Sequence, residues 1–192
     1  MVGPYATLRL SEHVFWQVRG AWGQSSNDIK SILTSSDNFS STRWLASTTL
    51  SGRWTDGAWT FRPAASVSFM EDIAQSYIGL YGVGIPDVSS RLGQAKVGPE
   101  WSVRMPMSPD LVIEPRFGAQ VIWNFASDVT SQGAAVGGEA ALSPGVRGRT
   151  EIGVGARSAN GTLLDVAGSY DGIGSSNYTA VTVKGTVLVP LN

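Results

Sequence analysis

Hydrophobic and polar residues alternate with a period of two along most of this chain. Between positions 95 and 105, Ala, Val, Pro, Trp, Val and Met take the odd positions, and Lys, Gly, Glu, Ser and Arg take the even positions. Successive side chains of a β-strand point to opposite faces of its sheet, so this alternation predicts strands with one apolar and one polar face. Nine segments follow the pattern: 3–11, 13–25, 40–55, 58–72, 90–106, 110–127, 146–158, 162–172 and 178–191.

The connections between these segments alternate strictly in length. Short ones lie at 11–13, 55–57, 108–110 and 159–161, and longer polar ones at 26–39, 73–89, 128–145 and 173–177. The short connections contain or adjoin turn-forming residues, such as Asp56-Gly57 and Asn160-Gly161. Tight turns at one end and longer loops at the other are typical of an antiparallel up-and-down barrel of the outer membrane. A Greek-key sandwich lacks this strict alternation.

All seven tryptophans fall on the apolar side of the alternation. A soluble sandwich would bury mostly Val, Ile and Leu there, so a Trp-rich face opposite a charged one favours a transmembrane β-barrel with lipid outside. Trp44 and Trp54 lie ten residues apart, as do Trp59 and Phe69, and ten residues of a tilted strand rise roughly 25 Å, the height of the apolar band between two aromatic girdles. Trp54 and Trp59 flank a short turn, which predicts that both lie at the periplasmic girdle. The predicted lipid-facing girdle residues are Trp16, Trp22, Trp44, Trp54, Trp59, Phe69, Trp101, Trp123 and Phe125.

The polar side of the alternation carries charges well inside the strands. Because a Lys or Arg facing lipid near the midplane would cost about 2–4 kcal/mol, their shared parity predicts that they line the lumen. The predicted lumen-lining residues are Arg9, Arg19, Arg43, Arg53, Arg62, Lys96, Glu100, Arg104, Glu114, Arg116, Arg149, Glu151, Arg157, Asp165 and Lys184. Such a lining either guides an extended polypeptide or biases small ions, or only keeps the barrel solvated and folded. Glu100 and Arg116 flank one tight hairpin and are expected to form a cross-strand ion pair.

Composition and charge narrow the function classes further. The chain has 192 residues, enough for one domain, and 15% charged residues, below the roughly 25% of a soluble domain. Its net charge of −1 and the lack of a Lys/Arg run argue against nucleic acid as a partner. It has no cysteine for a disulfide or thiolate site, and no apolar run near the roughly 18 residues of a membrane helix. The first residues lack the features of a signal peptide, so we expect a fragment of an exported protein.

Signals for catalysis are weak. The single histidine, His13, is predicted in a periplasmic turn, where it cannot complete a catalytic constellation at the outer rim. Gly153-Val-Gly155 and Gly172-Ile-Gly174 lack the third glycine and following helix of a nucleotide loop, so we expect their glycines to relieve crowding in a curved sheet. Asp165 and Asp171 lie too far apart on one strand to share a cation. We therefore predict no catalytic residue, no metal site and no cofactor.

Two stretches resemble the β-domain of autotransporters. In residues 5–28, a small-residue strand and a short turn lead into a strand that ends in Gly-Gln-Ser-Ser-Asn-Asp. Near the end, a Gly-rich strand (Glu-Ile-Gly-Val-Gly-Ala-Arg) is followed by an Asn-Gly turn, a strand with Ser-Tyr-Asp-Gly, a short loop and a last strand. The likeness covers essentially the whole chain in order.

The resemblance implies a twelve-strand barrel of the bacterial outer membrane, with a lumen helix and a secreted passenger on its N-terminal side. This chain would hold about the last nine strands, as one translocator domain over residues 1–192 that is truncated at its N-terminus. Implied partners are outer-membrane lipid or detergent, the barrel-assembly machinery and the passenger polypeptide. Two departures stand out: the chain ends in Val-Pro-Leu-Asn rather than Phe or Trp, and nine strands would close with a parallel pair. The alternative function is a passive small-solute pore or a structural barrel, engineered or truncated.

Overall fold

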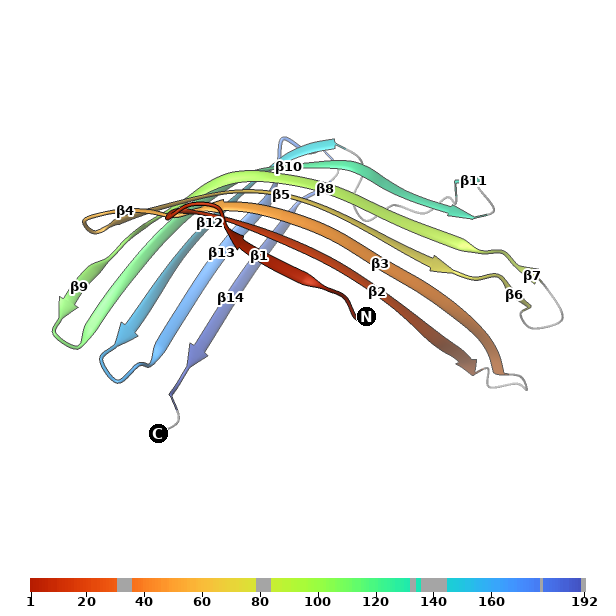
Figure 1. Cartoon of the computed structure of the whole chain (residues 1–192), viewed down its shortest axis with the longest axis horizontal. Coiled ribbons are helices and arrows are strands. Elements are labelled where there is room, and N and C mark those ends of the chain that lie inside the picture. Colours follow the sequence, from red (N-terminus) through yellow and green to blue (C-terminus); the bar gives the residue numbers. More distant parts are fainter. Residues whose placement is uncertain (31–35, 79–83, 132–133, 136–144, 177, 191–192) are drawn as a thin grey trace.

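The chain forms one large antiparallel sheet (Figure 1). The structure is a computed structural model, and it describes residues 1–30, 36–78, 84–131, 134–135, 145–176 and 178–190. The main strands, in chain order, are β1 (Tyr5–Arg9), β2 (Val14–Lys30), β3 (Ser36–Gly52), β5 (Trp59–Ala74), β8 (Val88–Val103), β10 (Leu111–Ser131), β12 (Gly145–Ser158), β13 (Leu163–Ile173) and β14 (Ala180–Leu188). Each predicted segment therefore corresponds to one main strand.

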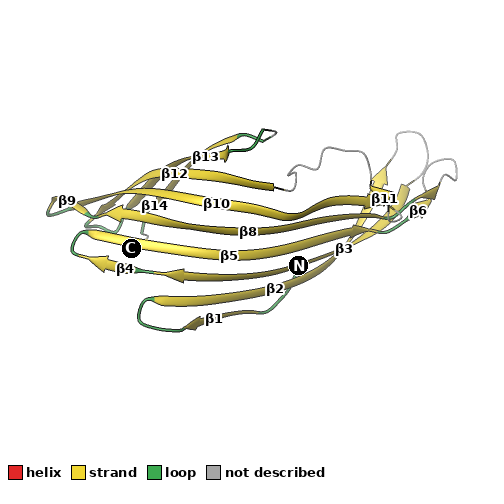
Figure 2. Cartoon of the chain, turned by 90° about the horizontal axis from the view of Figure 1, so that it is seen from above, coloured by secondary structure: helices red, strands yellow, loops and turns green. Residues whose placement is uncertain are grey.

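Neighbours along the chain are neighbours in the sheet. The order is β1-β2-β3-β5-β8-β10-β12-β13-β14, and every pairing is antiparallel. This is the predicted up-and-down topology. The sheet is not closed: within the described residues, β1 and β14 each pair on one side only and form its two edges. The strands bend over a common arch, as Figures 1 and 2 show from two directions.

Short strands extend or accompany the main ones. β4 (Trp54–Asp56) pairs with β5, and β9 (Met105–Ser108) and β11 (Ala134–Ala135) pair with β10. β6 (Tyr77–Ile78) and β7 (Gly84–Ile85) form a separate ribbon. β4 continues the register of β3, with Ser51 opposite Ala64 and Trp54 opposite Phe61. The interruption faces Pro63, which has no N–H to donate to the ladder.

The short turns gather at one end of the sheet and the longer connections at the other (Figure 1). Gly57 and Gly161 have φ values of 56° and 87°, the left-handed region that glycine enters without steric cost. The predicted turns at Asp56-Gly57 and Asn160-Gly161 are thus present. At the opposite end β2 reaches Lys30, β3 begins at Ser36 and β10 reaches Ser131, beyond the predicted limits. The hydrophobic alternation stops earlier there, but backbone pairing needs no apolar side chains.

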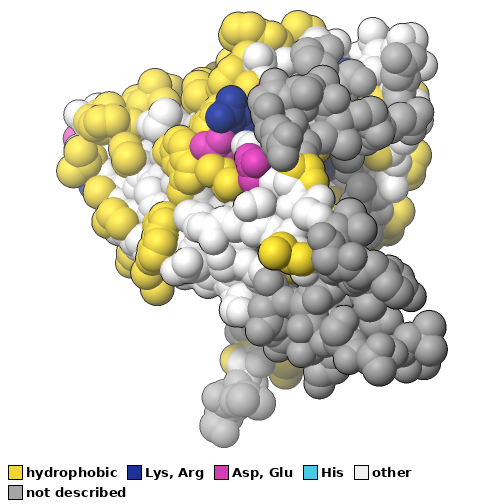
Figure 3. Space-filling view, turned by 90° about the vertical axis from the view of Figure 1, so that its right-hand side faces the viewer, with side chains coloured by type: hydrophobic (Ala, Val, Ile, Leu, Met, Phe, Trp, Pro, Cys, Tyr) yellow, Lys and Arg dark blue, Asp and Glu magenta, His cyan; other side chains and the backbone are white. Residues whose placement is uncertain are grey.

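The sheet has two unlike faces. The side chains of the concave face crowd together, so Ile122, Asn124 and Ser102 are almost fully buried, while tryptophans of the convex face are 36–60% exposed. Figure 3 views the end of the longer connections, where apolar side chains follow much of the outline around a small group of basic and acidic ones. In the residues that the structure describes, no helix is long and apolar enough to cross a membrane.

Candidate functional site

The strand register assembles an aromatic face from distant parts of the chain. Trp54, Phe61, Trp101 and Phe117 lie opposite one another on successive strands, with ring centroids 6.1, 5.4 and 6.3 Å apart. This row lies near the short turns. The register also puts every predicted girdle residue on this face. Phe61 and Phe117 were missing from the predicted girdle, although their parity matches that of the tryptophans.

A second group of aromatic residues lies on the same face, nearer the longer connections. Trp22 is opposite Trp44 in the register, and the Trp44 ring is 5.2 Å from that of Phe69. Trp123 and Phe125 meet edge to face, with centroids 5.6 Å apart. The face therefore carries aromatic residues near both ends of its strands, the arrangement expected of a barrel that crosses a bilayer.

Several polar groups on the aromatic face form hydrogen bonds. The indole Nε1 of Trp16 donates a hydrogen bond of 2.7 Å to Oγ1 of Thr48. Nearer the longer connections, the Glu71 carboxylate accepts hydrogen bonds from Trp44 (2.9 Å), Ser89 (3.1 Å) and Arg91 (2.6 Å). These pairs matter because an unpaired polar group costs several kcal/mol in hydrocarbon. Glu71 and Arg91 are charged exceptions on this face, and they lie toward the longer connections.

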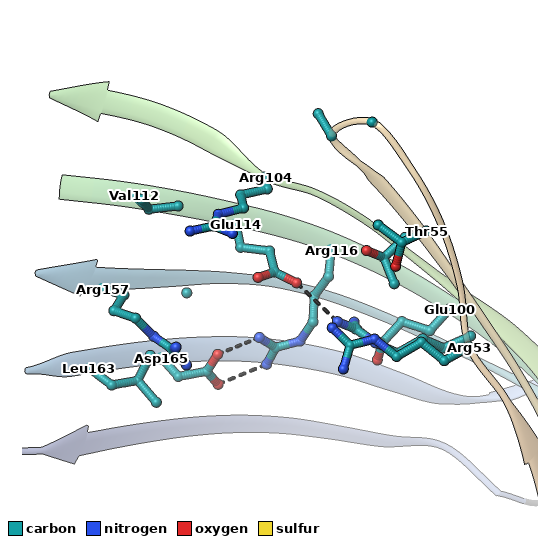
Figure 4. Close-up of a pocket in the computed structure, with 15 residues that line it drawn as sticks. Arg53, Thr55, Glu100, Arg104, Val112, Glu114, Arg116, Arg157, Leu163 and Asp165 are labelled. Carbon is teal, nitrogen blue, oxygen red and sulfur yellow. Dashed lines mark hydrogen bonds and ion pairs between the residues drawn. The ribbon is translucent and has the colours of Figure 1, made fainter. Parts of the chain in front are cut away.

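The concave face carries every residue predicted to line the lumen, and we call it the charged face. At its short-turn end lies a pocket of about 640 Å³ (Figure 4). Its charged lining consists of Arg53, Arg62, Arg104, Arg116, Arg157, Glu100, Glu114 and Asp165. These side chains come from strands between β3 and β13, so the pocket exists only once the sheet has formed.

Arg62 joins three strands within this pocket. Its guanidinium donates to Glu100 on β8 at 2.8 Å and to Glu114 on β10 at 3.2 Å. The buried hydroxyl of Ser102 also donates to Glu114, at 2.7 Å. The predicted ion pair between Glu100 and Arg116 is wrong. The register puts Glu100 directly opposite Arg62 on β5, whereas across the hairpin it faces Gly118, so the nearest cation lies on the earlier strand.

Arg116 instead reaches across a whole strand to Asp165. Nη2 of Arg116 lies 2.7 Å from Oδ1 of Asp165, and Nη1 donates to Oδ2. Between β10 and β13 lies β12, whose Gly153 is opposite Arg116 and whose Gly155 is opposite Asp165. A Cβ on Gly153 would lie 2.9 Å from the Arg116 guanidinium carbon. The two glycines thus form a passage for the ion pair, a specific case of the predicted relief of crowding.

A second ion pair is more deeply buried, toward the longer connections. Nε of Arg147 donates to Asp171 at 2.7 Å, and the two residues are only 7% and 9% exposed. The ring of Tyr178 covers the Arg147 guanidinium at 4.9 Å. Beside them, Gln94 donates to Asn124 at 2.8 Å. Arg147 was not among the predicted lining residues, although it shares the parity of Arg149 on the same strand.

The other predicted lining residues vary in their contacts. Arg43 pairs with Asp72 at 2.5 Å, and Arg149 with Glu151 at 3.3 Å. Arg9 donates to the backbone oxygen of Ser11. Within the described parts of the chain, seven basic residues of this face have no carboxylate within 4.0 Å: Arg9, Arg19, Arg53, Lys96, Arg104, Arg157 and Lys184.

The described residues contain no group of three or more His, Cys, Asp or Glu side chains that could hold a metal ion. His13 lies in the turn between β1 and β2, where its ring is 6.0 Å from that of Trp54. The carboxylates of the pocket are engaged by arginines. What this arrangement offers is a charged, water-accessible wall that can bind or guide a solute or a chain.

The topology and the two faces define a class: the antiparallel up-and-down sheet of an outer-membrane β-barrel, with one aromatic face and one charged face. The comparison with protein families is more specific. The family model of the autotransporter β-domain matches residues 1–171, most of the chain. The chain belongs to this family, whose domain is an outer-membrane β-barrel with a translocator or anchor role and is not known as a catalytic one. No curated protein and no solved structure matched it.

Proposed function

We propose that this chain is the translocator and anchor barrel of an autotransporter, and that it supports secretion of a passenger on its N-terminal side. The observation that carries the proposal is the separation of the two faces on a sheet of this family. The aromatic face presents apolar surface to outer-membrane lipid. The charged face then lines an aqueous lumen.

Each face has its own part in this function. Aromatic residues near both ends of the strands hold the sheet at a set depth, because indole rings prefer the membrane interfaces. The charged face gives a passing polypeptide water and hydrogen-bonding partners in place of hydrocarbon. Residues 1–192 act as one domain in this proposal, and the barrel-assembly machinery inserts it.

A display experiment tests the proposal. The full chain is expressed behind a signal peptide and a compact reporter passenger, in the natural order of passenger first. Externally added protease should remove the reporter from intact cells, and the barrel should show heat-modifiable migration on gels. A matched control replaces Trp54 and Trp101 by Asp, which puts charge on the aromatic face and should abolish both signals.

The alternative function, a passive small-solute pore, predicts a different pair of results. A barrel that inserts and conducts ions in planar bilayers, while its reporter stays protected from external protease, would contradict the secretion role and favour the pore. Loss of both insertion and display in the unmodified chain would contradict the membrane assignment of the two faces.

A further inference from the structure

Three arginines in the pocket of the charged face form no ion pair with a carboxylate in the described part of the chain. Arg53 lies between β3 and β4, Arg104 between β8 and β9, and Arg157 on β12. Within the described residues, no carboxylate lies within 4.0 Å of any of them, yet all three line the same pocket. We call these three residues the basic wall. Figure 4 shows them entering the pocket from different strands.

The carboxylates of the pocket are already committed to other donors. Glu100 and Glu114 accept hydrogen bonds from Arg62, and Asp165 accepts them from Arg116. With five arginines and three carboxylates in the lining, the pocket keeps an excess of two positive charges. The whole chain has a net charge of −1, so this excess is a local feature and does not reflect a basic composition.

Such an excess on a concave wall favours an anionic occupant. Like charges close together repel one another, and walls of low dielectric concentrate their field. Each guanidinium also has five N–H donors in a fork that matches a carboxylate or a phosphate. The chemistry therefore calls for anionic oxygens as the missing acceptors.

The extent of the basic wall indicates the size of the ligand. Arg53 and Arg104 are two strands apart, and Arg104 and Arg157 a further two. At about 4.8 Å between strands, the three residues span roughly 20 Å along the sheet. One phosphate or sulfate ion cannot bridge that distance. A polypeptide stretch with several Asp or Glu residues can.

We propose that the basic wall is a binding site for an acidic stretch of polypeptide at the short-turn end of the lumen. This inference rests on the proposed function in that it takes the charged face as the lumen. It adds which residues bind the passing polypeptide and which charge that polypeptide must carry. Its failure can be told from failure of secretion because binding is measured without export.

The test uses the whole chain folded in detergent micelles, with folding checked by heat-modifiable migration. The probe is a fluorescent twelve-residue peptide of alternating Glu and Ser, and its anisotropy reports binding. A peptide with Gln in place of Glu is the neutral control. We expect the acidic peptide to bind at least about tenfold more tightly than the neutral one, because charge-assisted hydrogen bonds are lost with each carboxylate. Added salt should weaken its binding.

Two triple variants locate the site. Arg53→Gln/Arg104→Gln/Arg157→Gln removes the basic wall and should lower the affinity for the acidic peptide about tenfold or more. Arg19→Gln/Lys96→Gln/Lys184→Gln removes the same charge from the charged face outside the pocket and should leave the affinity nearly unchanged. Should the first triple variant fold poorly, Arg104→Gln and Arg157→Gln singly are each expected to lower the affinity severalfold.

Three results would overturn the proposal. Equal losses of affinity for the acidic peptide in the two triple variants would mean that only the total charge of the face matters. Full competition by low-millimolar inorganic phosphate would mean a small-anion site instead. Equal binding of the acidic and neutral peptides to the folded chain would mean that the arginines recognise no acid at all. If passenger display succeeds together with any of these results, the secretion role is still supported and the binding role of the basic wall is refuted.

Discussion

The central strands and the two edges of the sheet hold their charges in different ways. Across β5, β8, β10, β12 and β13, ion pairs link side chains on different strands, such as Arg62 with Glu100 and Arg116 with Asp165. Near the edges, Arg19 on β2, which neighbours the edge strand β1, and Lys184 on the edge strand β14 have no carboxylate within 4.0 Å in the described residues. A central strand has neighbours on both sides and can find partners on either. Arg19 and Lys184 form no such ion pair in the described residues, so we expect the charges of the central strands to contribute more to stability.

The largest effect is expected at the most buried pair. Arg147→Gln leaves the Asp171 carboxylate buried without its cation and should lower the free energy of unfolding by about 3 kcal/mol. Urea unfolding in micelles, followed by tryptophan fluorescence, measures this loss. The double variant Arg147→Gln/Asp171→Asn should recover most of it. If Lys184→Gln at the edge lowers the free energy of unfolding by as much, the contrast between centre and edge does not hold.

A smaller effect is expected from closing the glycine passage. Gly153→Val puts a side chain where the Arg116 guanidinium lies and should separate it from Asp165, at a cost of about 2 kcal/mol. Gly168→Val on β13 is the matched control, because a Cβ there meets no atom within 4 Å. The same unfolding measurement compares the two. Equal stability of both variants would show that the ion pair does not need the passage.

Arg62 and Arg19 compare the centre of the sheet with the strand next to its edge. Arg62→Gln removes the cation between Glu100 and Glu114, and since these groups are about one-third exposed the loss should be about 1 kcal/mol. Arg19→Gln removes the same charge from a residue that forms no ion pair with the described part of the chain, and it should change stability by less than about 0.5 kcal/mol. A larger loss for Arg19→Gln would reverse the comparison.

The smallest effect is expected on the aromatic face. Thr48→Val removes the hydroxyl that accepts the hydrogen bond from Trp16. Hydrogen bonds between transmembrane helices contribute modestly, and a similar contribution in this sheet gives an expected loss of about 0.6 kcal/mol. Thr48→Ser keeps the hydroxyl and should retain most of the stability. A loss for Thr48→Ser as large as for Thr48→Val would assign the effect to the missing methyl group.

Local features of the chain account for the elements and their order. Alternation with a period of two follows from the geometry of a single strand, so the parity of Trp44 or Arg104 could be assigned without knowing any neighbour. The turns at Gly57 and Gly161 were equally predictable, because the positive φ that they need is a property of one residue. Arg147 could have been assigned by the same parity, since it lies two residues before Arg149.

The partners of the charged residues were decided by the tertiary structure. Glu100 was expected to meet Arg116 because a short hairpin makes them near neighbours along the chain, but the register gives it Arg62, 38 residues away. The bulge between Asn124 and Ala126 puts Asp128 opposite Arg91, which no alternation reveals. Alternation tells which face a side chain joins, since that depends on its own backbone alone. Its contacts depend on the register, the bulges and the curvature of several strands together, and these exist only in the assembled sheet.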